Sequence, residues 1–104
     1  MRRGEVWWAD LPIPAGRRPV LLLSRNEAYQ VRENVTVAPV TTRIRGIPTE
    51  VTLGPREGLR RSGVANLDSI MTIQKGLLRI RIAKLPPAKV DAVNRAIKFA
   101  LDLP

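Results

Sequence analysis

The chain of 104 residues has the length of one domain with one modest hydrophobic core. Its 18 Lys and Arg residues, most of them Arg, outnumber 9 acidic residues, and the net charge of +9 indicates a polyanionic partner such as nucleic acid. The absence of Cys and His excludes disulfides, zinc ribbons, thiol catalysis and acid–base chemistry by imidazole.

Nine prolines divide the first 85 residues into runs that are too short for most helices but suit strands. The run from residue 18 to 25 is continuously apolar at its centre, which is typical of a strand buried on both faces. In the run from 35 to 41, Pro39 indicates a bulge or an unpaired position. The predicted strands cover residues 5–10, 18–25, 35–41, 50–53, 64–67 with its continuation 70–73, and 78–84.

The segments between these strands are predicted to be irregular. Residues 11–17 contain two prolines and a glycine and indicate a loop, and the polar residues 26–34 favour a short helical turn. Residues 54–63 form a basic loop that carries Arg56, Arg60 and Arg61. Trp7 and Trp8 alternate across the first strand, so we expect one in the core and the other against a second subunit or an RNA base.

Near the end of the chain the apolar residues recur at intervals of three and four, which predicts a helix. Pro86 and Pro87 suit a helix start, and Asp91 is placed to pair with Arg95 one turn later. The apolar side of this helix is expected to contain Val90, Val93, Ile97 and Leu101. The predicted fold is α+β: five to seven short strands forming one small, highly curved barrel or sheet over residues 1–104, closed by a C-terminal helix.

Four segments of the chain resemble the MazF/PemK toxins. They are residues 3–11 (RGEVWWADL), 18–27 (RPVLLLSRNE), 37–42 (VAPVTT) and 67–73 (LDSIMTI), in the family's order and near its spacing. Together with the closing helix, the resemblance covers essentially the whole chain. It implies a small SH3-like barrel with a C-terminal helix, of the kind shared by the CcdB, MazF and PemK toxins.

The resemblance also implies an activity. Members are toxins of bacterial type II toxin–antitoxin systems: homodimeric endoribonucleases that cut single-stranded RNA and mRNA at specific sequences, which inhibits translation and growth. They work without metal or cofactor, by attack of a ribose 2′-hydroxyl on the adjacent phosphate, and leave a 2′,3′-cyclic phosphate and a 5′-hydroxyl. The expected partners are RNA and a cognate acidic antitoxin. With no membrane-spanning run or signal sequence apparent, a cytoplasmic location is expected.

The family's catalytic arginine and threonine correspond to Arg18 and Thr41. A guanidinium offers forked donors matched to phosphate oxygens, on which charge accumulates as the phosphorus becomes five-coordinate, and a threonine hydroxyl can donate a further hydrogen bond. The sequence does not show which residue accepts the 2′-proton. The residues expected to contact RNA are Arg17, Thr42, Arg43, Arg45, Arg61 and Ser69.

Two departures from the family concern specificity. The loop at 11–17 is short and lacks an acidic residue that many members carry there, and Ser69 stands where the family often has Gln. Two other functions are open at this point. A non-enzymatic gyrase inhibitor of the CcdB type would not need Arg18 and Thr41, and a small RNA-binding module of the ribosomal type would bind RNA and leave the strand intact.

Overall fold

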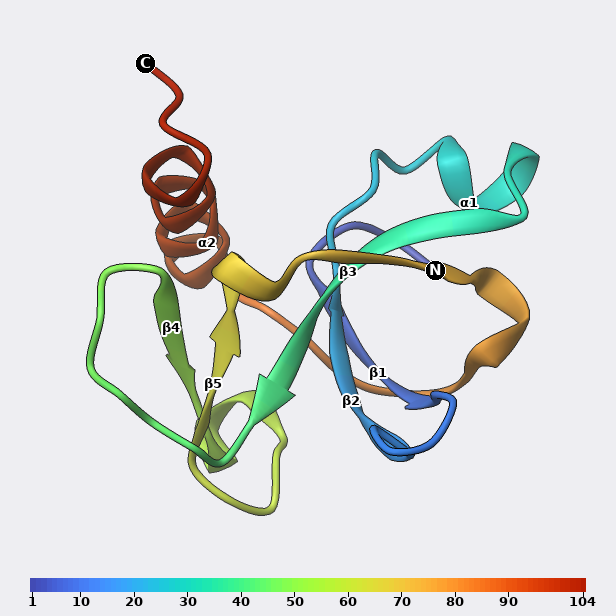
Figure 1. Cartoon of the computed structure of the whole chain (residues 1–104), viewed down its shortest axis with the longest axis horizontal. Coiled ribbons are helices and arrows are strands. Elements are labelled where there is room, and N and C mark those ends of the chain that lie inside the picture. The colour runs from blue at the N-terminus through green and yellow to red at the C-terminus, as the bar shows by residue number, and fades with distance from the viewer.

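Seven strands and a C-terminal helix make up the computed structural model, which describes residues 1–104 (Figure 1). The strands are β1 (Glu5–Asp10), β2 (Arg17–Leu22), β3 (Asn34–Thr41), β4 (Glu50–Leu53), β5 (Gly63–Asn66), β6 (Met71–Gln74) and β7 (Leu78–Lys84). The helices are α1 (Ala28–Val31) and α2 (Pro87–Ala100), with single 3₁₀ turns η1 (Pro55–Glu57), η2 (Leu67–Ser69) and η3 (Lys75–Leu77). The predicted α+β class and C-terminal helix are confirmed.

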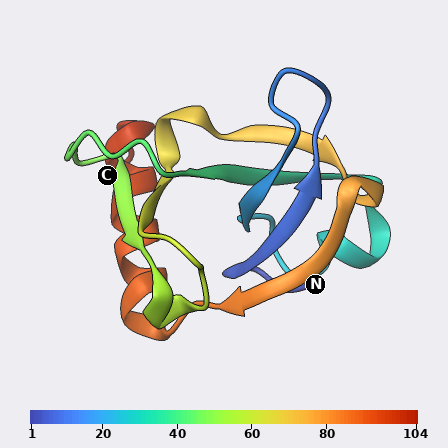
Figure 2. The same cartoon turned by 90° about the horizontal axis from the view of Figure 1, so that it is seen from below.

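All strand pairs are antiparallel, in the order β4-β5-β3-β2-β1-β7, and the sheet curls strongly (Figure 2). β5 pairs with the end of β3 and β6 with its beginning, so the predicted strand and its continuation lie end to end along β3. Between them η2 leaves Ala38 and Pro39 unpaired on that side of β3. This confirms an unpaired position at Pro39, whose missing N–H suits it to such a place.

The two faces of β2 enter two separate hydrophobic clusters. Leu21 packs with Val6 and Val93 beneath α2, whereas Val20 and Leu22 belong to the cluster enclosed by the curled sheet. All three β2 residues are fully buried, which confirms a strand covered on both faces. The strand ends at Leu22, before the predicted limit of 25, because the side-chain hydroxyl of Ser24 accepts the Thr36 N–H at 2.8 Å and takes the place of a strand carbonyl.

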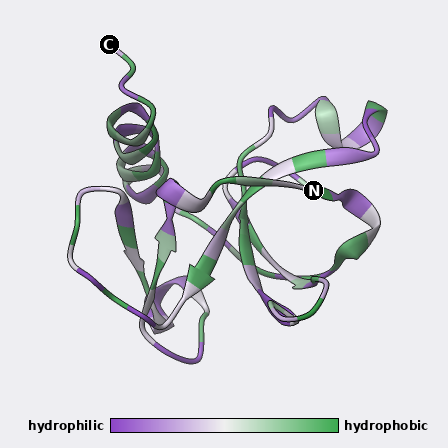
Figure 3. Cartoon of the chain, viewed as in Figure 1, coloured by the Kyte–Doolittle hydropathy of each residue, from purple (hydrophilic) through white to green (hydrophobic).

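Helix α2 covers one side of the sheet next to β4 (Figure 1) and carries both hydrophobic and hydrophilic residues (Figure 3). Its start at Pro87 agrees with the prediction, and Val93 and Ala96 are buried. Leu101 was wrongly assigned to the apolar side: it lies just beyond the helix and its side chain is 57% exposed. The predicted Asp91–Arg95 ion pair is also absent, because both side chains are exposed, where such a pair gains little.

None of the helices has the length and apolar character that crossing a bilayer requires.

Candidate active site

A pocket of about 410 Å³ opens between the sheet and the connection from η1 to β5. We call it the arginine pocket, because three guanidinium groups line it, those of Arg17, Arg60 and Arg61. Thr41 and Thr42 form part of its wall. Its apolar lining consists of Trp8, Pro19, Val40, Leu59 and Ile82. Cations around an apolar floor suit a ligand that has both charged and flat apolar parts.

Strand register explains why these side chains meet. Trp8 pairs with Pro19 between β1 and β2, so both side chains lie on one face, and Arg17 follows on the same face two residues earlier. The Arg17 guanidinium carbon lies 5.0 Å from the centre of the Trp8 ring, a cation–π distance. On the other wall only glycine fits at Gly63, because a Cβ there would lie 2.5 Å from the Thr41 carbonyl oxygen.

Arg18 projects from the opposite face of β2, opposite Ala9 of β1, and does not line the arginine pocket. The β2–β3 register pairs Val20 with Pro39, and continuing it by two residues sets Arg18 across from Thr41. The Arg18 Nε atom is buried and makes no hydrogen bond within the chain. A buried donor without an acceptor is costly and is found chiefly where a function requires it.

Thr41 ends β3 and is half-buried. Its Oγ1 accepts a hydrogen bond of 3.1 Å from the backbone N–H of Arg43. Because the hydroxyl accepts this bond, its own proton is left to be donated to another group. Arg18 and Thr41 therefore offer two donors, one charged and one neutral, at the same end of the sheet.

The exposed loop after Thr41 carries Arg43 and Arg45 and is held by Glu50 of β4. One carboxylate oxygen of Glu50 accepts the backbone N–H groups of Arg45 and Gly46, at 3.0 and 2.9 Å. Glu50 is not among the residues that the sequence singles out, and only the positive φ of Gly46, invisible in the sequence, marks the turn. Through this contact Glu50 fixes the path of two arginines expected to contact RNA.

The predicted site residues therefore divide into three groups. Arg17, Thr41, Thr42 and Arg61 meet in the arginine pocket, with Arg18 next to it on the other face of β2. Arg43 and Arg45 follow on the exposed loop. Ser69 ends η2, is exposed, and does not line the pocket.

Glu5 carries a buried carboxylate that the sequence does not single out. It is 4% exposed and accepts hydrogen bonds from the backbone N–H of Arg2, from the Trp7 indole at 3.0 Å and from Arg81 at 3.2 Å. Burial alone would raise the pKa of the Glu5 carboxyl, but these bonds outweigh it and lower that pKa from its ordinary value. Glu5 is thus a structural anion that joins β1 to β7.

Replacing Glu5 by Gln should lower the free energy of unfolding by about 2 kcal/mol at pH 7, since charge-assisted bonds become neutral ones. A carboxyl with a lowered folded-state pKa stabilises the fold above its unfolded pKa and loses that effect as the pH falls through the folded value. The difference from the wild type should therefore vanish in acid. Urea unfolding measured from pH 7 down into the acid range, until the two proteins agree, tests this, with Asp10→Asn in the exposed Asp10–Arg79 pair as the control of small effect.

Few of the Lys and Arg side chains form salt bridges. Only Arg79 with Asp10 and Arg81 with Glu5 form salt bridges, which leaves 16 of the 18 Lys and Arg side chains unpaired. No three carboxylates gather in a group that could hold a metal ion. The surface is therefore strongly cationic. Apart from Arg3, Lys75 and Lys89, whose side chains donate hydrogen bonds within the chain, these cations make no side-chain hydrogen bond and are available to phosphates.

Comparison with known proteins decides the family. Residues 2–101 match the model of the PemK-like, MazF-like toxin of type II toxin–antitoxin systems. The chain belongs to this family. It is 39% identical over 101 residues to the Mycobacterium tuberculosis protein named "Probable endoribonuclease MazF5", an alignment that covers 96% of the chain and 92% of that protein.

Solved structures of the family agree with the fold. The Mycobacterium tuberculosis toxin MazF-mt6 superposes with a TM-score of 0.89 at 36% identity, over 96% of this chain and 98% of that one. A mycobacterial endoribonuclease in complex with its cognate antitoxin gives a TM-score of 0.86 at 32% identity, over 100% and 97%. The predicted family, the SH3-like fold and the type II toxin class are confirmed. The names of the MazF relatives do not favour the gyrase-inhibitor alternative.

Proposed function

We propose that this MazF-family toxin is an endoribonuclease that cuts single-stranded RNA, with Arg18 and Thr41 as its catalytic residues. The observation that carries this proposal is the Arg18 guanidinium, whose buried Nε has no hydrogen-bond partner in the chain. The Thr41 hydroxyl, which accepts the Arg43 N–H and keeps its own proton for another acceptor, lies at the same end of the sheet. Hydrogen-bond donors that have no partner within the fold are available to stabilise the negative charge that develops on the phosphate during the reaction. The endoribonuclease names of the relatives support the same class of activity.

In the proposed reaction a ribose 2′-oxygen attacks the adjacent phosphorus. The O2′–P bond forms, the P–O5′ bond breaks, the 2′-proton leaves to solvent or a base, and the departing 5′-oxygen takes up a proton. Negative charge grows on the non-bridging oxygens as the phosphorus becomes five-coordinate. Arg18 would bind these oxygens through its forked N–H groups, and Thr41 would donate one further hydrogen bond. The products carry a 2′,3′-cyclic phosphate and a 5′-hydroxyl.

The remaining cations would hold the RNA strand. Arg17 and Arg61 with Thr42 line the arginine pocket, and Arg43 and Arg45 lie on the loop that Glu50 holds. Their contacts to phosphates would add affinity that falls with rising salt. Ser69 is proposed to contact RNA from the end of η2, at a separate position along the strand.

We further propose that the toxin works as a homodimer in the cytoplasm and is neutralised by an acidic antitoxin. Its relatives include an endoribonuclease solved with its cognate antitoxin and a MazE–MazF complex from Deinococcus radiodurans. The 16 cations of each chain that form no salt bridge would attract an acidic polypeptide, as they would attract RNA. The proposed antitoxin would therefore compete with RNA for the same surface.

The proposed activity is tested by incubating the purified toxin with a defined single-stranded RNA in the presence of EDTA. We expect cutting to continue at an unchanged rate, since the phosphate charge is met by a guanidinium. Intact RNA under all conditions would contradict the endoribonuclease and leave the alternatives that do not cut RNA. Cutting that stops with EDTA and returns with Mg²⁺ would contradict the proposed mechanism.

A further inference from the structure

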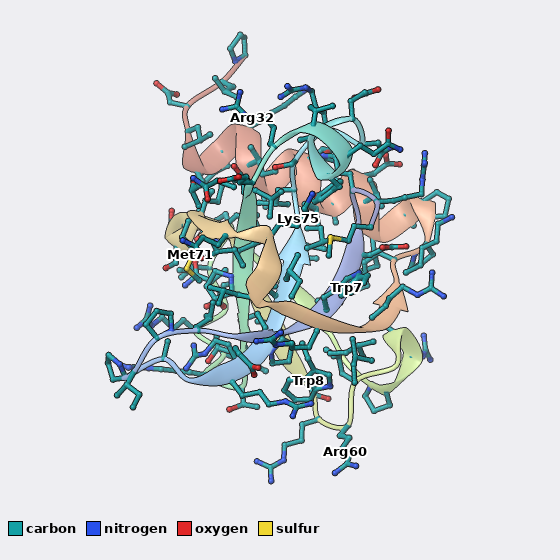
Figure 4. All side chains as sticks on the ribbon, turned by 90° about the vertical axis from the view of Figure 1, so that its right-hand side faces the viewer. Trp7, Trp8, Arg32, Arg60, Met71 and Lys75 are labelled. Atoms are coloured by element: carbon teal, nitrogen blue, oxygen red, sulfur yellow. The ribbon has the colours of Figure 1, made fainter.

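The two adjacent tryptophans of β1 are used differently by the fold. The Trp7 indole N–H donates to Glu5, and its ring packs against the cluster inside the curled sheet. Trp8 projects from the other face, is half-buried and lines the arginine pocket. In Figure 4 Trp8 lies on the side of the molecule that carries Arg60. Trp8 thus presents a partly uncovered aromatic group to a pocket, a role that packing does not account for.

The cations of the arginine pocket form no salt bridges. Arg17, Arg60 and Arg61 are exposed, and none of them is within salt-bridge distance of a carboxylate. The Arg17 guanidinium carbon lies 5.0 Å from the centre of the Trp8 ring, which is a cation–π contact. An aromatic ring and a guanidinium plane flanked by further cations are the elements with which proteins bind an unpaired base and its phosphate. The volume of about 410 Å³ falls in the range of small-molecule sites, which admits a nucleotide.

The wall that carries Arg60 and Arg61 is fixed before any ligand arrives. Gly58 has a φ of +93°, and a Cβ there would lie 3.2 Å from the Ile82 carbonyl oxygen of β7. Glu57 accepts the Gly54 N–H at 2.7 Å, and Leu59 is buried beneath the connection. A preformed wall loses less conformational entropy on binding than a mobile loop would.

From this arrangement we propose that the arginine pocket is a base-selecting subsite, which takes one unpaired nucleobase next to the scissile phosphate. The base stacks on Trp8 and Arg17, and Arg60 and Arg61 bind the phosphate of that nucleotide. This rests on the proposed function for its substrate, single-stranded RNA. Thr41 links the two sites, because it lines the pocket and the β2–β3 register, continued two residues beyond Val20–Pro39, sets it across from Arg18. The subsite therefore sets the preferred base at one position beside the cut.

Binding to an RNA that cannot be cut tests the subsite separately from catalysis. The probe is a single-stranded RNA with a 2′-deoxy sugar at the cut position, in which each neighbouring nucleotide is made abasic in turn. We expect one abasic position to weaken binding about 5–150-fold, the effect of losing one stacked base, and the others to have little effect. The Trp8→Leu variant should bind every probe with the weak affinity, whereas Trp8→Phe keeps a ring and retains the positional difference.

Trp7→Phe is the matched control, since it alters the neighbouring aromatic residue on the opposite face of β1. Circular dichroism and thermal melting identify any variant that does not fold. In that case Arg60→Gln combined with Arg61→Gln, both exposed, serves instead and should weaken binding and flatten its salt dependence. Equal binding of all abasic probes would overturn the subsite, even if the RNA is cut as proposed. So would variants that bind RNA normally but escape the antitoxin, since the pocket would then take a protein segment.

Discussion

Replacing Arg18 by Ala should abolish RNA cutting while the toxin stays folded. The guanidinium is the one charged donor at the proposed centre, and removing a single preorganised donor typically lowers the rate by about 10²–10³-fold. Arg18 also leaves no salt bridge or hydrogen bond behind when it is removed, so the fold loses little. Single-turnover cleavage of a defined RNA measures the rate, and thermal melting checks the fold.

Two variants complete this experiment. Arg18→Lys keeps the charge but lacks the forked geometry, and should restore only part of the rate. Arg32→Ala removes the same charge at an exposed position far from Trp8 and Arg60 (Figure 4), and should cut normally. If the Arg18→Ala protein is folded and cuts RNA at the wild-type rate, the assignment of the catalytic residue is wrong.

Removing one hydroxyl from the substrate should have an equally large effect. With a 2′-deoxy sugar at the cut position, the nucleophile of the proposed reaction is absent and we expect no product at that site. The chain has neither Cys nor His to offer another nucleophile or an imidazole base. Gel analysis over long incubation measures any residual cutting.

The control is the same RNA with a single 2′-deoxy sugar two nucleotides away from the cut. That substrate keeps the attacking hydroxyl and should be cut at a rate close to that of the unmodified RNA. Cutting at a position that lacks its 2′-hydroxyl would require a water nucleophile, and would refute the proposed attack while leaving the nuclease activity in place.

The fold could be predicted where local pattern and tertiary packing agree. The alternation of β1 correctly separates Trp7 from Trp8, and the apolar run of β2 correctly indicates burial on both faces. Prediction failed where a single contact decides the outcome. The Ser24 hydroxyl shortens β2, and Leu101 keeps the helical spacing but lies past the last turn of α2.

The candidate site was only partly predictable for a related reason. Arg18 and Thr41 follow from the resemblance, but the arginine pocket depends on contacts between segments far apart in the chain. Arg60 and Arg61 line the same pocket as Trp8 because glycines allow the η1–β5 connection to lie against β3 and β7. Glu50 acts on its loop through one carboxylate oxygen. Nothing in the sequence pattern shows such contacts.

The ends of the RNA fragments test the central claim most directly. A defined RNA cut by the wild-type toxin in EDTA should give, by mass spectrometry, an upstream fragment ending in a 2′,3′-cyclic phosphate and a downstream fragment with a 5′-hydroxyl. These ends arise only if the neighbouring 2′-oxygen attacks the phosphorus. A 3′-hydroxyl on the upstream fragment and a 5′-phosphate on the downstream one would contradict the account.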